Sequence, residues 1–514
     1  MSAASKNRDK VPDWLRWRST VSPGSLAVKV GSAEWTYREL QQITSDLAAA
    51  LHKLGLSRGD RIALLMSPSE NYIGLVHAAA RLGAVVVPLN HRQSIPELAS
   101  QLGDSRPSLV VADDSGGDKA RELEKTGWVG RWERVSRIAS AAGRARPIVG
   151  VELDISAPHA IIYTSGSSGT PQGVELTLSN LLWNAVSVGL RVGASPDDRW
   201  LLCMPLFHVG GYAILFRSLL QGSGIVLHPR FDPKRVSLSL DNDEITLVSF
   251  VPTMLTELLE ARGRKPLRPR VRTIFLGGDQ APPTLVTAIR ERRLPVLLTY
   301  GMTETCSHVA VSNAWSSSDG PAYLPILPTE VSVTRRGRKG KVEFAKEGEV
   351  GEVAVRGPTV FTGYWRRPTL TRSKFKGGWF LTGDLGVAAE AVGRRASAGV
   401  VILGRKEETI ITGGEKVFPA EVEAALKEHS AVKDAVVVGV DDEKWGQKVV
   451  AVVEAKGGFA GRPPTSAELS AFLRSRVGRY KVPKQYHIWE TLPRTPTGKV
   501  RRAEVRLMLA RGGS

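Results

Sequence analysis

The sequence has few cysteines and no long hydrophobic run. Its 514 residues include only two cysteines, Cys203 and Cys306. Two thiols cannot form a disulfide framework or a zinc site with four cysteine ligands, so we expect a reducing compartment, the cytoplasm. No run of 18 apolar residues is present, and the charged first ten residues have no apolar segment behind them. We therefore expect neither a membrane span nor a secretory signal.

The chain carries a strong positive charge. The formal net charge is +19, because 70 Lys and Arg residues outnumber 51 Asp and Glu residues. Such an excess is typical of proteins that bind nucleic acid, a membrane surface or polyanionic small molecules. The basic stretch at residues 262–272 has no interleaved aromatic residues, and no zinc-finger or RNA-binding motif is present. A surface rich in solvated Arg explains most of the charge, and we expect no nucleic-acid partner.

The apolar pattern predicts an α/β protein. Between about residues 60 and 300, continuous runs of Val, Ile and Leu alternate with amphipathic stretches. Continuous runs are typical of strands buried on both faces, so we expect a large N-terminal domain of stacked, largely parallel sheets flanked by helices. The predicted strands are residues 61–66, 85–87, 225–227, 247–250, 273–276 and 296–298. The predicted helices that separate several of them include residues 253–261 and 283–292.

The character of the sequence changes near residue 404. A helical pattern and two Val-rich runs follow, at residues 419–428, 435–440 and 449–453. Thr465 and Glu468 then form a Thr-x-x-Glu capping box, which predicts the start of another helix. We therefore predict two domains, the large one over residues 1–403 and a small α+β domain over residues 404–514.

A loop rich in Gly and Ser follows a predicted strand at residues 160–163. Residues 163–173 read Tyr-Thr-Ser-Gly-Ser-Ser-Gly-Thr-Pro-Gln-Gly, and the period-two pattern after them predicts a second strand. Glycines let several backbone N–H groups turn to one side, and the hydroxyl groups add donors, so the loop could hold a phosphate. It is neither a Walker loop nor a Gly-x-Gly-x-x-Gly loop. From the loop sequence alone, a flexible turn without a ligand is an equally good interpretation.

Three further polar or glycine-rich clusters come after predicted strands or apolar runs. They are Met-Pro-Leu-Phe-His-Val-Gly-Gly at residues 204–211, Gly-Gly-Asp at 277–279 and Tyr-Gly-Met-Thr-Glu-Thr at 300–305. Ligands bind beyond the carboxyl ends of the strands in open parallel sheets, so these clusters can face one crevice. A single histidine or Thr-Glu pair is more often structural than functional. Their joint occurrence in register with the sheet favours a binding site.

These segments, in this order, resemble the motifs of the adenylate-forming superfamily of acyl-CoA ligases, luciferases and peptide-synthetase adenylation domains. The resemblance rests on the loop at 163–173, Tyr-Gly-Met-Thr-Glu-Thr, Thr382-Gly383-Asp384, Gly404-Arg405 and Pro496-Thr497-Gly498-Lys499, and it covers nearly the whole chain. Within the superfamily, residues 204–211, 300–307 and 442–447 look most like the CoA ligases that act on o-succinylbenzoate in menaquinone synthesis. Ligases of fatty or aryl acids are the alternative.

The resemblance implies a two-step reaction that uses ATP, Mg²⁺ and CoA. A carboxylate would attack the α-phosphate of ATP to give an acyl-adenylate and pyrophosphate, and the CoA thiol would then displace AMP. Both steps develop negative charge on oxygen, which fixed donors and cations stabilise. The expected partners are these small molecules, with a homo-oligomer left open. Because o-succinylbenzoate has two carboxylates, a cationic or donor group must also hold the one that does not react.

The resemblance also implies roles for individual residues around the nucleotide. The β- and γ-phosphates would be held by Thr164, Ser165, Gly166, Ser167, Ser168 and Gly169. Thr303 would contact the α-phosphate, and the carboxylate of Glu304 would bind Mg²⁺, a cation that prefers oxygen ligands. The adenine and ribose would lie against Gly278, Asp279, Tyr300, Asp384 and Arg405. The ATP-binding set is completed by Gln172, Gly301, Met302 and Lys499.

The C-terminal domain is implied to be mobile. Lys499 would bridge the carboxylate and the α-phosphate in the first step, acting as a point charge supplied by a separate domain. The domain would then rotate about Glu407, so that a face around Gly413 and Gly414 lines the CoA tunnel. The acyl pocket and its gate would consist of Gly277, Gly278 and His208. The implied catalytic residues are Thr303, Glu304, His208 and Lys499.

The chain departs from the pattern of the superfamily at Tyr323, Leu324 and Glu407, and most clearly in the phosphate loop. The loop of the superfamily normally ends Pro-Lys-Gly, whereas this chain has Gln172 in place of the lysine. A neutral amide holds phosphate more weakly than an ammonium group, so we expect a higher apparent KM for ATP. Two other classes stay open. A module that loads a carrier protein is disfavoured because no carrier segment follows Ser514, and a nucleic-acid-binding protein with an inactive ligase fold is suggested only by Gln172 and the net charge.

Overall fold

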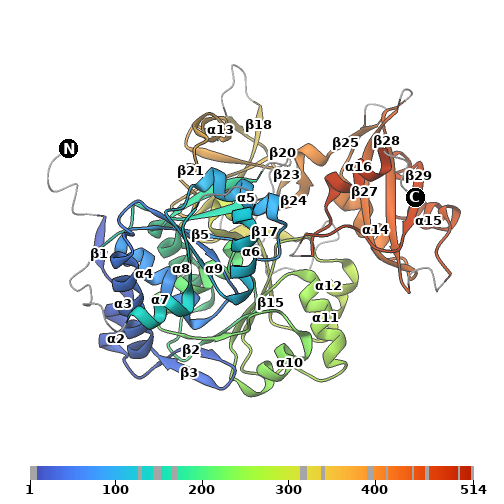
Figure 1. The fold of residues 1–514 in the computed structure, drawn as a ribbon. Coiled ribbons are helices and arrows are strands. Elements are labelled where there is room, and N and C mark those ends of the chain that lie inside the picture. Colours follow the sequence, from blue (N-terminus) through green and yellow to red (C-terminus); the bar gives the residue numbers. More distant parts are fainter. Residues whose placement is uncertain are drawn as a thin grey trace.

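The computed structural model describes most of the chain. The described residues are 9–125, 130–142, 152–164, 171–312, 321–336, 342–389, 399–412, 415–442, 445–457, 462–495 and 498–510. A large α/β body, blue to yellow in Figure 1, carries a smaller orange and red unit at one side. The predicted loop residues Ser165, Gly166, Ser167, Ser168 and Gly169 and the predicted tunnel residues Gly413 and Gly414 lie outside the described residues.

A seven-stranded sheet forms one layer of the large body, in the order β21-β10-β9-β5-β4-β6-β7. The strands are β4 (Arg61–Leu65), β5 (Val85–Pro88), β6 (Leu109–Ala112), β7 (Trp132–Arg134), β9 (Pro158–Thr164), β10 (Gln172–Thr177) and β21 (Gly363–Tyr364). The five strands from β9 to β7 are parallel, whereas β10 and β21 are antiparallel to their neighbours. The hairpin of β9 and β10 brackets the Gly- and Ser-rich loop.

A longer sheet forms the second layer. Its order is β19-β18-β20-β23-β24-β17-β16-β15-β14-β13-β11-β12-β2-β3. The parallel part comprises β2 (Leu26–Val30), β11 (Arg199–Leu202), β12 (Gly224–Leu227), β13 (Leu247–Phe250), β14 (Thr273–Leu276) and β15 (Val296–Met302), with β3 (Ala33–Thr36) antiparallel at the edge. The antiparallel part comprises β16 (Ser307–Ser312), β17 (Ala322–Pro325), β18 (Glu330–Arg336), β19 (Val342–Phe344), β20 (Val350–Arg356), β22 (Phe375–Lys376), β23 (Trp379–Ala389) and β24 (Gly399–Arg405).

Helices fill the space between the two sheets and cover their outer faces. The largest core cluster joins β4 of the first sheet, β11 of the second and the helix α9 (Val209–Gln221). α9 is buried on almost every side, and its sequence is accordingly apolar except for Arg217, Ser218 and Gln221. The other helices of the body are α2 (Trp14–Val21), α3 (Tyr37–Lys53), α4 (Glu70–Leu82), α5 (Ile95–Ser105), α6 (Asp114–Lys125), α7 (Val135–Ala142), α8 (Leu178–Val192), α10 (Pro233–Asn242), α11 (Pro252–Arg262), α12 (Pro283–Glu291) and α13 (Pro368–Lys374).

The small unit is built on one five-stranded sheet with helices on both faces. Its strands are β25 (Ile410–Thr412), β26 (Glu415–Val417), β27 (Val432–Asp442), β28 (Gly446–Ala455) and β29 (Gln485–Trp489). One core cluster joins the sheet to α14 (Pro419–Lys427) and α15 (Ser466–Arg474), and another joins it to α16 (Arg502–Ala510). Thr465 caps α15 through the predicted box with Glu468, which confirms that prediction.

The fold class predicted from the sequence is confirmed. Five of the six predicted strands and the helices at 253–261, 283–292 and 419–428 lie within two residues of the observed bounds, whereas the strand predicted at 296–298 extends to Met302. The antiparallel strands from β16 to β24 were not predicted. The domain boundary at residue 404 stays a prediction, and it falls at the end of β24. In the described parts of the chain, no helix is both long and apolar enough to cross a membrane.

Candidate active site

Three of the predicted nucleotide-binding residues meet at one point of the longer sheet. The Tyr300 hydroxyl donates a hydrogen bond of 2.7 Å to Oδ2 of Asp384, and Nε of Arg405 lies 2.9 Å from Oδ1. Asp384 and Arg405 are directly paired residues of β23 and β24, and Tyr300 comes from β15 of the same sheet. The sheet therefore brings Tyr300 to Asp384, which lies 84 positions later in the sequence.

Asp384 is buried, and its neighbours hold it in place. Burial raises the pKa of Asp384, while the charge of Arg405 and the hydrogen bond from Tyr300 oppose that rise. Burial and the nearby carboxylate raise the pKa of Tyr300 well above its ordinary value, so its hydroxyl keeps its proton and can donate it. The result is a carboxylate with fixed orientation, which suits an acceptor for a pair of hydroxyl groups.

Thr303 and Glu304 lie in a short 3-10 turn (η1, Thr303–Thr305) directly after β15. Oε1 of Glu304 accepts a hydrogen bond of 2.9 Å from the Tyr364 hydroxyl, and its main-chain carbonyl accepts one of 2.8 Å from the N–H of Phe361. Both partners come from the segment around β21, which the sequence analysis did not single out. Tyr364 leaves the second carboxylate oxygen of Glu304 free of that bond.

The donor set fits Mg²⁺ bound mainly by phosphate and water. Among the described residues, no group of three or more His, Cys, Asp and Glu side chains is placed to hold a metal ion. Mg²⁺ keeps several waters and is commonly bound through one or two carboxylates together with substrate phosphates. The single carboxylate of Glu304 at this turn therefore suits such a cation, with the remaining ligands supplied by the nucleotide and water.

Two glycines allow a close approach of backbone segments around this point. A Cβ on Gly277 would lie 2.0 Å from Oγ1 of Thr299, and one on Gly301 would lie 2.1 Å from the carbonyl oxygen of Ser307. Gly278 has a φ of +87°, in the left-handed region that favours glycine. It leads into Asp279, which is exposed at the end of β14. The predicted acyl and adenine residues thus lie at the carboxyl ends of adjacent parallel strands, β14 and β15.

The predicted phosphate loop is anchored on both sides. Thr164 ends β9 and Gln172 begins β10, and the two residues are directly paired. The Thr164 hydroxyl donates a hydrogen bond of 3.4 Å to the carbonyl oxygen of Gln172. The side chain of Gln172 is partly exposed, at the position where the family pattern has lysine.

His208 immediately precedes α9, and its imidazole is largely enclosed. Its Nε2 atom is buried without a hydrogen-bond partner among the described residues, and its ring centroid lies 4.6 Å from that of Phe207. Burial lowers the pKa of His208 to about 4, and the charges of Lys499 and Arg92 lower it further. His208 is therefore neutral at pH 7, and Lys499 of the small unit lies near enough to influence it.

Lys499 approaches the same region from the small unit. Its charge also lowers the pKa of Asp384, which places the ammonium group within electrostatic reach of both His208 and the Asp384 cluster. The adjacent Gly498 contacts the large body, because a Cβ there would lie 3.2 Å from Oγ1 of Thr253 on α11. Glu407 is exposed in the short η3 turn (Lys406–Glu408) that links β24 to the small unit.

The sequence analysis did not single out Arg217, a fully buried cation on α9. Its Nε donates a hydrogen bond of 2.8 Å to Asn184, whose amide nitrogen in turn donates one of 2.7 Å to the carbonyl oxygen of Cys306. Its Cζ lies 5.7 Å from the ring centroid of Trp200, and its Nη2 has no hydrogen-bond partner among the described residues. Burial lowers the pKa of Arg217 to about 10. A single charged residue in an otherwise largely apolar helical segment is the sequence pattern that could have identified Arg217.

The large body thus combines stacked sheets with the paired Asp384 and Arg405, and a small unit that carries Lys499 lies against it. The chain belongs to the AMP-binding enzyme family, which it matches over residues 15–365. Residues 421–499 match the AMP-binding enzyme C-terminal domain. The chain is thus an adenylate-forming enzyme by sequence as well as by fold.

Individual relatives are similar over nearly their whole length. The chain is 37% identical to 2-succinylbenzoate–CoA ligase from Geobacillus kaustophilus (strain HTA426), covering 97% of this chain and 98% of the relative. It resembles the structure of o-succinylbenzoate CoA synthetase from Bacillus subtilis in complex with the acyl-adenylate intermediate, with a TM-score of 0.86, 32% identity and coverage of 97% and 98%. The same B. subtilis enzyme in complex with ATP and magnesium ion gives a TM-score of 0.87 at 32% identity, with coverage of 97% and 100%.

Proposed function

We propose that the protein is an ATP-dependent ligase that converts o-succinylbenzoate to o-succinylbenzoyl-CoA, a step of menaquinone synthesis, in the cytoplasm. The proposal is supported by the similarity to ligases of that substrate over almost the full chain. That similarity carries the choice of substrate, and the buried Arg217 is consistent with a dicarboxylic acid. A buried guanidinium without an acidic partner among the described residues is costly, and a dicarboxylic acid supplies what it lacks.

The nucleotide would be bound mainly by the large body. The fixed carboxylate of Asp384 accepts the two ribose hydroxyl groups, and the backbone turn at Gly278 lies beside the adenine with Asp279 and Tyr300. Thr303 contacts the α-phosphate, and Glu304 holds Mg²⁺, which neutralises phosphate charge when bound. The loop between β9 and β10 holds the β- and γ-phosphates with Gln172 at its edge.

The first step needs a cation where negative charge develops. The attacking carboxylate and the α-phosphate repel each other, so a positive group between them lowers the barrier. Lys499 is the candidate, because its charge reaches both His208 at the acyl side and Asp384 at the ribose side. Neutral His208 closes the acyl side without adding a second charge. In the second step, the small unit would turn about Glu407 and present its Gly413–Gly414 face to CoA.

Arg217 would bind the carboxylate of the substrate that does not react. It lies nine residues after His208 on α9, which corresponds to about 13 Å along the helix axis. Through Asn184, Arg217 is also connected to Cys306, directly after the turn that carries Thr303 and Glu304. One end of the substrate is thereby fixed relative to the phosphate contacts.

The proposal predicts the product and the effect of losing the guanidinium. Incubation with ATP, Mg²⁺, CoA and a mixture of o-succinylbenzoate, fatty acids and simple aryl acids should give o-succinylbenzoyl-CoA as the main thioester by mass spectrometry. In Arg217→Met, KM for o-succinylbenzoate should rise by at least about tenfold, because a charge-assisted contact is lost, with Arg217→Lys between the two.

The matched control is a substrate analogue without the second carboxylate. Wild type and Arg217→Met should use that analogue with similar kcat/KM, since neither makes the contact. A fatty acyl-CoA or an aryl-CoA as the main product would contradict the choice of substrate. An equal loss of kcat/KM for both acids would show that Arg217 acts on the fold instead.

A further inference from the structure

The turn that carries Lys499 is closed by its own backbone. The N–H of Thr495 donates a hydrogen bond of 2.7 Å to the carbonyl oxygen of Lys499, and Arg494 and Val500 form an isolated antiparallel bridge. Gly498, next to the lysine, has a φ of +84° in the left-handed region, and its N–H donates a bond of 2.8 Å to the carbonyl oxygen of Thr495. These bonds join Thr495 to Gly498 and Lys499, but none of them fixes the position of these residues relative to the sheet of the small unit.

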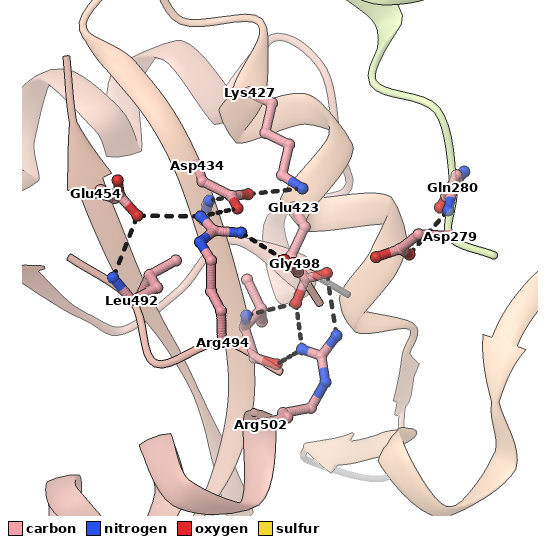
Figure 2. Close-up of polar contacts among 12 residues, drawn as sticks. Asp279, Gln280, Glu423, Lys427, Asp434, Glu454, Leu492, Arg494, Gly498 and Arg502 are labelled. Atoms are coloured by element: carbon pink, nitrogen blue, oxygen red, sulfur yellow. Dashed lines mark hydrogen bonds and ion pairs between the residues drawn. The ribbon is translucent and has the colours of Figure 1, made fainter. Parts of the chain in front are cut away.

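Arg494 makes that second connection. One arm of its guanidinium, Nη1, donates a hydrogen bond of 2.9 Å to the carbonyl oxygen of Gly498. The other arm, Nη2, lies 2.5 Å from Oδ2 of Asp434 on β27 and 3.1 Å from Oε2 of Glu454 on β28. Figure 2 shows the guanidinium between the two carboxylates and the turn. A single side chain therefore joins the turn to two adjacent strands.

The two carboxylates form a site that requires a cation. Asp434 and Glu454 are directly paired across β27 and β28, so their charges repel each other. The side chain of Glu454 is only 2% exposed and that of Asp434 only 14%. Burial opposes their ionisation, but nearby cations and hydrogen bonds outweigh it and hold the pKa of each carboxyl below its ordinary value. Both are therefore charged at pH 7, and Arg494 contacts both.

Two lysines also pair with these carboxylates, but Arg494 is the cation of this network that also contacts the turn. Lys427 lies 2.7 Å from Oδ1 of Asp434, and Lys433 lies 2.6 Å from Oε1 of Glu454. Both lysines pair with the oxygens that Arg494 does not use. The planar guanidinium can bind the carboxylates with one arm and a carbonyl with the other, whereas an ammonium group offers no such fork. The network can thus stay charged without Arg494. Leu492 (N–H to Glu454, 3.2 Å) and Arg502 (to the carbonyl oxygen of Val437, 2.7 Å) still hold the two flanks of the turn, but Gly498, next to the lysine, loses its side-chain link to the strands.

We propose that Arg494 is a positioning residue that holds the Lys499 turn in register with the sheet, so that the ammonium group meets the reacting oxygens in the first step. The inference rests on the role proposed above for Lys499. The turn also contacts Thr253 of the large body through Gly498, so a shift of the turn displaces the lysine at the site itself. A displacement of about 1 Å in a reacting group can cost roughly 100-fold in rate.

The test separates the two half-reactions in the full-length protein. Adenylate formation is measured by pyrophosphate exchange, and thioester formation by single turnover of supplied acyl-adenylate with CoA. Arg494→Met should slow adenylate formation by roughly 10- to 100-fold and leave thioester formation within about twofold of wild type. Arg494→Lys should lie between the two. Combined with Lys499→Ala, the Met substitution should add no further loss, because the lysine that it positions is gone.

Arg476→Met is the matched control, because Arg476 also pairs with a glutamate in the small unit (Nε to Oε2 of Glu428, 3.0 Å) but does not contact the turn. It should leave both half-reactions near wild type. Suppose that Lys499→Ala alone forms the adenylate slowly. The inference is then overturned if Arg494→Met and Arg494→Lys slow both half-reactions equally, or if they leave adenylate formation unchanged. If Lys499→Ala forms adenylate at the normal rate, the proposed role of the lysine fails first, and that of Arg494 fails with it.

Discussion

Gln172 gives the nucleotide site one cation fewer than the family pattern. It begins β10 directly opposite Thr164, at the edge of the predicted phosphate loop. In Gln172→Lys, KM for ATP should fall by roughly three- to tenfold, since a charged donor binds phosphate more strongly than an amide. Steady-state kinetics with varied ATP and saturating o-succinylbenzoate and CoA measure the change.

Gln172→Met, which has a similar length and no donor, serves as the control for that prediction. Its KM for ATP should rise above the wild-type value if the amide donates to phosphate. A lysine variant without a lower KM would show that residue 172 does not reach the phosphates.

Motif residues were predictable one by one, but their supporting partners were not. Tyr300, Asp384 and Arg405 stand in short recognisable segments, so the sequence was enough to nominate them. Tyr364, which donates to Glu304, and Arg217, which is buried on α9, stand in segments without such a pattern. Their importance depends on contacts with residues 60 and 33 positions away, and no local spacing encodes those contacts.

At the scale of elements, the position of η1 depends on a bulge between β15 and β16. The pairing of these strands shifts between Tyr300 and Gly301, and a Cβ on Gly301 would lie 2.1 Å from the carbonyl oxygen of Ser307. Gly301→Ala should therefore push the strands apart and move Thr303 and Glu304. We expect kcat/KM for ATP to fall by roughly 100-fold, measured by pyrophosphate exchange.

Gly103→Ala is the control for this steric effect. Gly103 lies in α5, where an added Cβ has no atom within 4 Å, so the substitution should leave activity unchanged and stability equal or higher. Wild-type activity in Gly301→Ala would mean that the bulge does not set the geometry of the turn.

The parallel strands were predictable and the antiparallel ones were not, because their burial differs. β4, β13 and β14 are buried along almost their whole length and read as continuous apolar runs. β23 alternates between buried and half-buried positions, and its sequence contains Thr, two Gly and Asp. The residues that would reveal its period are those used for the site, so function obscures the strand pattern.

For the whole molecule, buried neutral histidines predict a loss of stability in mild acid. Burial lowers the pKa of His77 to about 4 and of His159 to about 3, and that of His208 to about 4. In the unfolded chain these groups titrate near 6.5, so the unfolded state takes up protons first. Stability should be complete above about pH 6.5 and decrease as the pH falls toward 4. The raised pKa values of Asp384 and Glu257 act in the opposite direction, but burial also lowers the pKa of His308, which adds to the effect of the three histidines.

Thermal unfolding at constant ionic strength measures this dependence. Between pH 7.5 and pH 5, Tm should fall by at least about 5 °C. His159→Gln should show a smaller fall, because glutamine can keep the hydrogen bond to the Tyr212 hydroxyl (3.0 Å) and does not titrate. A Tm that is constant over this range would contradict the assignment of neutral buried histidines.

The relation between the two units was beyond what the sequence could predict. The motif order implied that a lysine arrives from a separate unit, but the contact of Gly498 with Thr253 and the fork of Arg494 depend on surfaces that form only after each unit has folded. A prediction from local sequence pattern therefore identifies Lys499 but not the contacts that position it.

The continuity of the longer sheet has a consequence for inhibition. Tyr300, Asp384 and Arg405 are carried by strands of one sheet, whereas Lys499 depends on a turn of the other unit. On the roles proposed above, nucleotide recognition belongs to the large body and reactivity to the small unit. A compound that fills the ribose side alone can be bound in every orientation of the small unit, while one that bridges to the lysine would trap a single orientation. The two kinds of inhibitor should differ in residence time far more than in contact area.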